Sequence, residues 1–387
     1  MGSLSLKQMF HFTFLLCFIT LLFVYNYSEQ RLSLLTDTSY LYTLNVEIEI
    51  LHNLSKVNVK AGKNPILILA YTSFFGVKPW PVFKNLTCNF DTSNFKISHD
   101  ENDFYKSDVV IFHGPNMPSL SKLQRIQSNR KFGQLWIYFS MEPIPKNANI
   151  EEFSVFFNIV STYAINSDIR IPYRYHAKKN NSEKKTFKID NFSHKNKMVA
   201  WFVSNCNGKE RSKLVQKLRL YGIDFEVSGI CSKYYSKTFK SSCQKRPCYN
   251  DLKYFKFYFS AENRLCEDYI TEKYWETLNN DVIPIVLGGS NYSDPRLAIP
   301  GSFIDAMSFD SPKALANHIL SVSTNQSKYN AYFEWKNSWK LDTNSYYCSL
   351  CQKFKQGITL TKNNLIKTMN IQKCWTPTTK FFSWIKK

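Results

Sequence analysis

Short apolar runs recur along most of the chain and predict the strands of a covered parallel sheet. They lie at residues 65–71 (PILILAY), 107–114, 134–140, 197–204, 223–227, 255–262 and 282–288. Continuous apolar runs, in contrast to strict alternation, are typical of strands with both faces buried. Helical patterns occupy residues 210–222 and 268–280 between these runs. Alternating strand and helix predicts an α/β fold with largely parallel sheets.

A longer apolar segment, residues 9–25, carries no charge and follows Lys7. Its length of about 17 residues is at the short end of the range for a membrane-spanning helix and overlaps a signal-peptide core. No small-x-small cleavage pattern follows it, so we favour a retained signal anchor over a removed signal. Positive charge before the segment predicts a cytoplasmic tail of residues 1–8 and a luminal remainder. The polar, weakly periodic residues 26–62 predict a stem.

Composition supports this single-pass type II arrangement. Nine of the ten cysteines lie beyond the predicted anchor, which suits an oxidising lumen, and their odd number leaves at least one thiol free or paired between chains. For Cys348-x-x-Cys351 a structural disulfide is favoured over a zinc half-site, because no second ligand pair has convincing spacing. Seven Asn-x-Ser/Thr sequons begin at Asn26, Asn53, Asn85, Asn180, Asn191, Asn291 and Asn325.

The lysine-rich residues 176–196 contain few apolar positions and predict an exposed connection between two halves. The expected domains are residues 63–175 and 197–360, followed by a tail of residues 361–387. The net charge of +20 allows nucleic acid, anionic glycans, membrane phosphates or a diphosphate donor as partners. Neither a phosphate-loop motif nor a Gly-x-Gly-x-x-Gly fingerprint is present, so ordinary kinase, GTPase and dinucleotide functions have no support.

The segment most informative for chemistry is residues 257–292, in which an apolar strand runs directly into polar groups. Open α/β sheets place ligands at the carboxyl ends of their strands. A helix beginning at about Asp268 would offer its N-terminal amides to a diphosphate. Lys273 could offset phosphate charge, while Glu272 and Asn263 could bind sugar hydroxyls. The structural alternative is an N-capped amphipathic helix with a solvent-exposed Glu-Lys face.

The sequence ENRLCEDYITEK, followed by VIPIVLG, NYSDP, GSFIDAMSFDSPKALANHI and KYNAYFEWK, resembles the signature region of α1,3-fucosyltransferases, glycosyltransferase family 10. Three other stretches resemble the family's upstream segments: LWIYFSMEPIPKN, the element ending in SDIRIPY, and KMVAWFVSNCNGKERSKLVQKL. The similarity spans residues 65–354 and is closest over residues 257–354. The cysteines from Cys243 to Cys266 resemble those of invertebrate members.

The resemblance implies a GT-B fold of two Rossmann-like domains that transfers L-fucose from GDP-fucose, with inversion, to O3 of N-acetylglucosamine at the Golgi membrane. It implies Glu142 as the general base. It also implies donor-binding roles for Arg211, Asn263, Tyr269, Glu272 and Lys273, of which Arg211 and Lys273 would face the diphosphate. No Asp-x-Asp element is present, so we expect no required metal, with stimulation by Mn²⁺ left open.

Three departures from the family pattern keep alternatives open. Met141-Glu142-Pro143 lacks the residue that the family has between Glu and Pro, which allows a catalytically inactive glycan-binding relative. Residues 279–281 and Gly289-Ser290 also differ, and we expect both near the fucose and acceptor side, which allows a different donor. A nucleic-acid-binding protein conflicts with the anchor, sequons and cysteines. The sequence leaves open whether the acceptor is an N-glycan core or a lactosamine-type chain.

Overall fold

The structure is a computed structural model that describes residues 65–84, 86–144, 150–183, 192–206, 209–235, 237–238, 249–342, 345–358, 366, 374–375 and 379–387. The chain divides into two units, Met1–Asn58 and Val59–Lys387, and all described residues belong to the second. None of the helices in these ranges is long and apolar enough to cross a membrane. The predicted anchor, residues 9–25, and the predicted stem, residues 26–62, lie outside the described residues.

The first sheet is parallel throughout and has the strand order β2-β1-β3-β4-β5-β6. Its strands are β1 (Ile66–Ala70), β2 (Phe95–Ser98), β3 (Val109–His113), β4 (Leu135–Ser140), β5 (Ile159–Thr162) and β6 (Ile169–Arg170). The order reverses between β1 and β3, as in doubly wound sheets.

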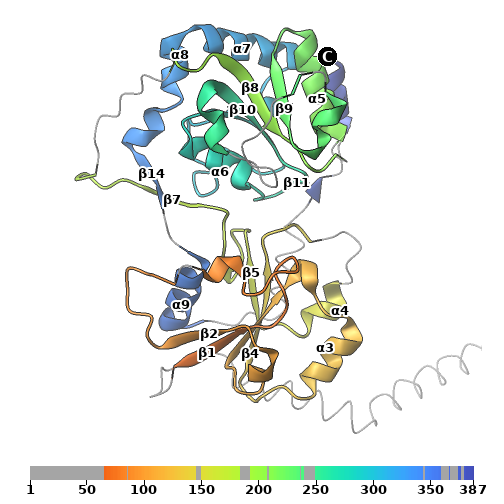
Figure 1. Ribbon diagram of the computed structural model, residues 1–387, viewed down its shortest axis with the longest axis vertical. Coiled ribbons are helices and arrows are strands. Elements are labelled where there is room, and N and C mark those ends of the chain that lie inside the picture. The colour runs from red at the N-terminus through yellow and green to blue at the C-terminus, as the bar shows by residue number, and fades with distance from the viewer. Residues whose placement is uncertain are drawn as a thin grey trace, which may run out of the picture. The chain divides into compact units, whose positions relative to one another are not determined.

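Helices cover both faces of the first sheet (Figure 1). On one face, Leu123 of α3 (Leu120–Gln127) packs with Phe112 and Trp136. On the other, Tyr346 of α9 (Tyr346–Gln356) contacts Phe139, with ring centroids 4.7 Å apart. The short α4 (Ile150–Ser154) precedes β5. Helix α9 follows the second sheet in sequence, so the chain returns to the first sheet near its C-terminal end.

The second sheet is also parallel, with the order β13-β12-β10-β8-β9. Its strands are β8 (Lys197–Phe202), β9 (Phe225–Ser228), β10 (Phe255–Ala261), β12 (Ile283–Leu287) and β13 (Ile304–Asp305). Residues of α5 (Lys209–Leu220), α7 (Pro312–Thr324) and α11 (Thr379–Lys386) form the core on one face. Helix α6 (Glu272–Asn279) and the 3-10 helix η5 (Tyr249–Tyr254) pack on the other. Here the strand order reverses between β8 and β10.

Two antiparallel ribbons and several short helices complete the described chain. Strand β7 (Tyr175–Lys178) pairs with β14 (Trp339–Asp342), and β11 (Leu265–Cys266) pairs with β15 (Cys374–Trp375). The remaining helices are α8 (Gln326–Ala331), η1 (Pro81–Phe83), η2 (Glu101–Asp103), η3 (Gly114–Asn116), η4 (Ile230–Tyr234), η6 (Ala306–Ser308) and η7 (Glu334–Asn337).

The predicted α/β architecture with two Rossmann-like sheets is confirmed. Each of the seven predicted strands is present. The prediction of a helix from about Asp268 is wrong, because Asp268 has a φ of 58° and the helix begins at Glu272. Thr271 caps it by accepting a hydrogen bond from the Lys273 amide. The N-terminal backbone amides of this helix therefore belong to Glu272 and the residues after it, not to Asp268.

The predicted exposed connection over residues 176–196 is not exposed at every described position. Its first residues belong to β7, and Lys195 is only 3% exposed. The Lys195 ammonium donates to the Lys253 carbonyl at 3.4 Å. Residues 184–191, which contain three of the lysines of this segment, lie outside the described residues.

Three disulfides connect described cysteines: Cys88–Cys348, Cys206–Cys231 and Cys266–Cys374. Cys348 therefore pairs with a residue 260 positions away, not with Cys351. Cys351 is buried and free, and burial raises the pKa of its thiol to about 12. The expectation of a structural disulfide is confirmed for Cys348 and wrong for Cys351, which accounts for a free thiol. Cys243 and Cys248 lie outside the described residues.

Candidate active site

The carboxyl ends of β8 and β10 meet at the point where the order of the second sheet reverses, which is where doubly wound sheets bind ligands. Arg211, in the first turn of α5 after β8, lies at this position and is 4% exposed. Its Nη2 donates to the Asn205 carbonyl at 2.7 Å. Among the described residues, no acceptor is within hydrogen-bond distance of its buried Nε. A buried guanidinium with an unused donor can bind an anionic oxygen.

A buried ionic cluster follows β10. The Glu262 carboxylate accepts hydrogen bonds from Thr271 N and Thr271 Oγ1, each at 2.8 Å. Lys273 Nζ lies 3.3 Å from Glu262 Oε2, 3.0 Å from Glu272 Oε1 and 2.9 Å from Thr271 Oγ1. The Glu262 side chain is fully buried, whereas 17% of Lys273 and 43% of Glu272 remain exposed. The cluster thus presents one partly exposed ammonium group on a buried support.

Electrostatics keep Lys273 charged and link the cluster to Arg211. Burial lowers the pKa of Lys273, but the carboxylates of Glu262 and Glu272 outweigh it and hold that pKa above its ordinary value. Burial raises the pKa of Glu262, and the Lys273 ammonium opposes this shift. For Arg211, burial lowers the pKa and the Glu262 carboxylate is the main opposing charge. Two cations therefore lie beside Glu262 at one end of the sheet.

Other buried polar atoms near this edge also lack partners in the part of the chain that the structure describes. They are Asn263 Oδ1, which follows β10, and Ser290 Oγ and Tyr292 Oη, which follow β12. Buried polar atoms without partners are costly, so they mark positions where a ligand or water completes the hydrogen bonds. Hydroxyl-rich ligands such as sugars are suited to such atoms.

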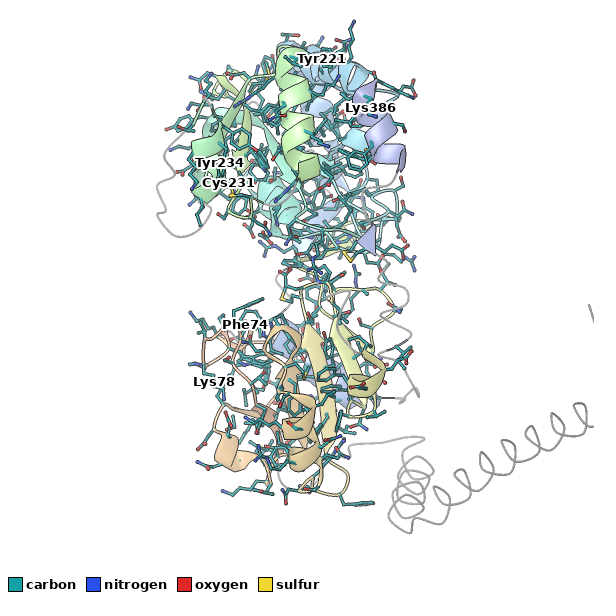
Figure 2. The ribbon with its side chains drawn as sticks, turned by 90° about the vertical axis from the view of Figure 1, so that its right-hand side faces the viewer. Phe74, Lys78, Tyr221, Cys231, Tyr234 and Lys386 are labelled. Atoms are coloured by element: carbon teal, nitrogen blue, oxygen red, sulfur yellow. A yellow bond between two sulfur atoms is a disulfide. The ribbon has the colours of Figure 1, made fainter. Side chains whose placement is uncertain are left out.

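Close backbone approaches shape the same edge. A Cβ on Gly289 would lie 2.4 Å from the Leu265 carbonyl carbon, so the loop after β12 requires glycine there. Gly229, after β9, has a φ of 99°, and a Cβ on it would lie 2.7 Å from the Val203 carbonyl oxygen. The Cys206–Cys231 disulfide connects the loops that follow β8 and β9. Cys231 and Tyr234 lie together in η4, at the end of the second sheet (Figure 2).

Glu142 directly follows the end of β4 in the first sheet. Its Oε2 accepts a hydrogen bond from Tyr269 Oη at 2.8 Å, and its Oε1 accepts one from Tyr173 Oη at 3.1 Å. Its backbone is held by Ser140, whose Oγ donates to the Glu142 carbonyl at 2.7 Å and accepts from the Glu142 amide at 3.1 Å. The carboxylate is thus held by two phenols, and each oxygen retains a further lone pair for a proton.

The structure brings the predicted residues into two groups. Lys273 lies between the carboxylates of Glu262 and Glu272. The charge of Glu262 also acts on Arg211, and Asn263 is next to Glu262 in sequence. Tyr269 contacts Glu142 instead, and it also packs on Tyr163 with ring centroids 5.0 Å apart.

Two site residues had no role in the sequence interpretation. Glu262 carries the same signal as Glu142, a carboxylate directly after a buried strand, and could have been found from it. Tyr173 belongs to the SDIRIPY element, but nothing in the sequence indicates that its hydroxyl reaches Glu142.

The expectation that both altered segments lie near the fucose and acceptor side is at odds with the position of residues 279–281. Asn279 ends α6, Asn280 caps it, and Asp281 lies in the turn before β12, at the amino end of that strand, where it pairs with Lys336. A parallel strand separates its two ends, so this turn is remote from the carboxyl edge. Gly289 and Ser290 do follow the carboxyl end of β12.

Metal binding is not evident in the described residues, where no three His, Cys, Asp or Glu side chains form a metal-binding group. The expectation that the reaction requires no metal stays a prediction.

Comparisons with known proteins give the family. The model "Fucosyltransferase, N-terminal" matches residues 63–174, and the model "Glycosyltransferase family 10 (fucosyltransferase) C-term" matches residues 192–371. The chain is 31% identical to α-(1,3)-fucosyltransferase fut-6 of Caenorhabditis elegans over 307 residues, which cover 77% of each chain. The chain therefore belongs to the glycosyltransferase family 10 fucosyltransferases.

Other relatives agree. Identity is 30% over 322 residues to α-(1,3)-fucosyltransferase C of Drosophila melanogaster, covering 74% of this chain and 72% of the relative. It is 32% over 274 residues to 3-galactosyl-N-acetylglucosaminide 4-α-L-fucosyltransferase FUT3 of Homo sapiens, covering 68% and 72%. A crystal structure of an α1,3-fucosyltransferase with GDP-fucose covers 86% of this chain and 96% of its own, with 16% identity and a TM-score of 0.47. At that similarity, no site residue is transferred from it.

Proposed function

We propose that the chain transfers L-fucose from GDP-fucose to O3 of N-acetylglucosamine in glycoprotein or glycolipid glycans, using a GT-B arrangement of its two Rossmann-like sheets. The observation that carries this proposal is the pair of unlike sites at the strand ends. One holds a carboxylate between two phenols, and the other holds a buried arginine and a lysine kept charged by two carboxylates. The named activities of the relatives in worm, fly and human support the choice of fucose as the sugar.

Each group has a role in a single inverting displacement. Glu142 removes the proton from the acceptor hydroxyl as that oxygen attacks the anomeric carbon, because a carboxylate positioned at the reacting hydroxyl is a general base. Lys273 and Arg211 offset the charge that develops on the departing GDP. Asn263 and Glu272 bind donor hydroxyls, and Tyr269 connects the donor segment, to which it belongs, with the base through its hydrogen bond to Glu142. We propose that the reaction requires no metal.

The surroundings of Glu142 favour the proposal of an active enzyme over that of an inactive glycan-binding relative. Although Met141-Glu142-Pro143 is one residue short, the Glu142 carboxylate is partly exposed and both of its oxygens are engaged by well-placed donors. A vestigial carboxylate would have no need for this support.

The test is turnover by the full-length chain in detergent with GDP-fucose and a panel of N-glycan-core and lactosamine-type acceptors. We expect one acceptor to gain fucose on O3, identified by NMR of the product, with activity retained after treatment with a chelator. GDP-mannose and GDP-glucose serve as control donors. Binding of GDP-fucose without transfer to any acceptor would favour the glycan-binding alternative, and turnover of another donor would contradict the choice of fucose.

We also propose a Golgi membrane location with the catalytic region in the lumen. The uncharged residues 9–25, the seven sequons and the three disulfides among described cysteines support it. Immunofluorescence with a Golgi marker and sensitivity of the chain to an N-glycosidase would test it. A chain that is insensitive to the glycosidase and not membrane-bound would contradict this location.

A further inference from the structure

We infer that Tyr173 is the positioning residue for the general base: its hydroxyl fixes the Glu142 carboxylate in the orientation that proton removal requires. This inference rests on the proposed function and extends it to a residue outside the donor segment. Tyr173 lies three residues beyond Arg170, the last residue of β6, and β5 separates β6 from β4, the strand that Glu142 follows.

The geometry makes Tyr173 a support for the whole turn that carries Glu142. Its hydroxyl is 3.1 Å from Glu142 Oε1 and 2.9 Å from the Met141 carbonyl oxygen. Its single proton can be donated to either acceptor, and an ionised carboxylate is the stronger of the two. The turn is already fixed at its backbone by Ser140, so the remaining freedom of Glu142 is rotation of its side chain. Tyr173 restricts that rotation.

The two phenols on Glu142 have different places in the molecule. Tyr269 belongs to the donor segment, and its hydroxyl is bound to Oε2 at 2.8 Å. Tyr173 and Glu142 both follow strands of the first sheet, and the ring of Tyr173 lies 6.0 Å from that of Tyr269. With Oε1 held by Tyr173, Oε2 is the oxygen directed toward the donor-side residue and is the one that accepts the proton. Small displacements of a reacting group are costly, since an error of about 1 Å can lower a rate about 10²-fold.

Tyr173 does not replace Glu142 as the base. Burial, followed by the carboxylates of Glu142 and Glu272, raises the pKa of Tyr173 well above its ordinary value of 10. The phenol therefore stays protonated and acts only as a hydrogen-bond donor. Its contribution to the rate acts through Glu142, which distinguishes a positioning residue from a residue that merely stabilises the fold.

The experiment is a double-mutant cycle with Tyr173→Phe and Glu142→Gln in the full-length chain, with transfer from GDP-fucose as the readout. Tyr173→Phe removes one oxygen atom and retains the ring that packs beside Tyr269. The matched control is Tyr175→Phe. Tyr175 is a half-buried tyrosine two residues away, and its hydroxyl contacts Ser349 Oγ at 2.7 Å and the Arg170 carbonyl at 3.0 Å instead of Glu142.

We expect Tyr173→Phe to lower kcat about 10–100-fold while the KM for GDP-fucose changes less than about twofold, as for other misplaced reacting groups. In the Glu142→Gln background, Tyr173→Phe should cause no further loss. Tyr175→Phe should leave kcat near that of the parent in both backgrounds.

Three outcomes would overturn the inference: an equal loss from Tyr173→Phe in both backgrounds, an unchanged kcat in the otherwise unaltered chain, or loss of cooperative thermal unfolding in Tyr173→Phe. Failure of the proposed function is separate, because the unaltered chain would then transfer no fucose.

Discussion

The two parallel sheets share one winding order but differ in what their strands present at the carboxyl edge. The first sheet presents a carboxylate, Glu142, held by neutral phenols. The second presents two cations: Lys273, which pairs with the buried Glu262, and Arg211, whose pKa the Glu262 carboxylate raises against the effect of burial. Topology determines that ligands bind at these edges, whereas the few residues that follow each strand determine the chemistry. In the mechanism that we propose, the first sheet supplies the group that removes the proton and the second supplies the groups that stabilise the leaving group.

A comparison within the second sheet shows that burial alone does not set the charge of a lysine. Lys273, at the carboxyl edge, has two carboxylates within 3.3 Å, and its pKa is held above the ordinary value. Lys195 precedes β8 at the amino edge, where burial lowers its pKa to about 8. Its one hydrogen bond among the described contacts is to the Lys253 carbonyl at 3.4 Å. The lysine that we propose to act on the donor is thus the one with carboxylate partners.

The largest expected effect is that of Lys273→Met, which we expect to lower kcat about 10²–10³-fold, the usual cost of removing a group that stabilises developing negative charge. It also leaves Glu262 as a buried carboxylate without its cation, which costs about 3–5 kcal/mol of unfolding free energy. Both quantities are measured by transfer kinetics and by urea unfolding.

The double variant Glu262→Gln/Lys273→Met separates the two effects of the lysine. Stability should return because the uncompensated charge is gone, while transfer should stay low. Recovery of transfer in the double variant would show that Lys273 supports the fold and not the leaving group.

The next effect concerns pH and the amino-edge lysine. The pKa of Lys195 is about 8 in the folded chain and has its ordinary value of 10.5 in the unfolded chain. Between these two pH values the unfolded chain therefore binds more protons than the folded chain. Stability therefore rises as pH increases from 8 to 10.5, and the cost is fully present below pH 8. We expect Lys195→Met to stabilise the chain by up to about 3 kcal/mol at pH 7, since one pKa unit corresponds to about 1.36 kcal/mol.

Urea unfolding of both chains from pH 7 to 10 measures this difference, which should decrease steadily above pH 8. Lys313→Met, at an exposed position of α7, is the control and should show no such dependence. If Lys195→Met raises the unfolding free energy by the same amount at every pH, packing and not the ammonium charge is responsible.

A somewhat smaller effect is expected for Arg211→Met. A hydrogen bond to a charged group contributes about 1.5–3 kcal/mol. Its loss therefore corresponds to a roughly 10–150-fold decrease in kcat/KM for GDP-fucose. Lys213→Met removes the same charge from an exposed position of the same helix and should have little effect. Similar losses in both variants, measured by initial rates over a range of donor concentrations, would mean that only the net charge of α5 matters.

The sequence predicted the interior of the fold better than its edges. The predicted strands match β1, β3, β4, β8, β9, β10 and β12, because strands buried on both faces read as continuous apolar runs. The edge strands β2, β6 and β13 were not predicted, and neither was the interior strand β5, although its four residues are all buried. The three edge strands span only 2–4 residues, and Phe95 is the only buried side chain of β2. Such strands exist because a neighbouring strand pairs with them, which the local pattern does not show.

The candidate site was predictable where chemistry follows a strand directly, as for Glu142 and the residues after β10. The start of α6 was mispredicted by four residues, because the left-handed backbone of Asp268 leaves no sequence pattern. The contact of Tyr269 with Glu142 joins residues 127 positions apart, and that of Tyr173 joins residues 31 apart. Contacts between side chains from different strands depend on how the sheet is assembled, so the sequence alone did not reveal them.

The central claim is that the two sheets divide the reaction, and it is tested most directly by titrating GDP-fucose calorimetrically into Glu142→Gln while measuring transfer with the same preparation. We predict a Kd within about twofold of that of the unaltered chain, together with a loss of transfer of about 10²–10⁴-fold, the contribution usual for a general base. A parallel loss of donor binding, or transfer at the original rate, would contradict the division of roles.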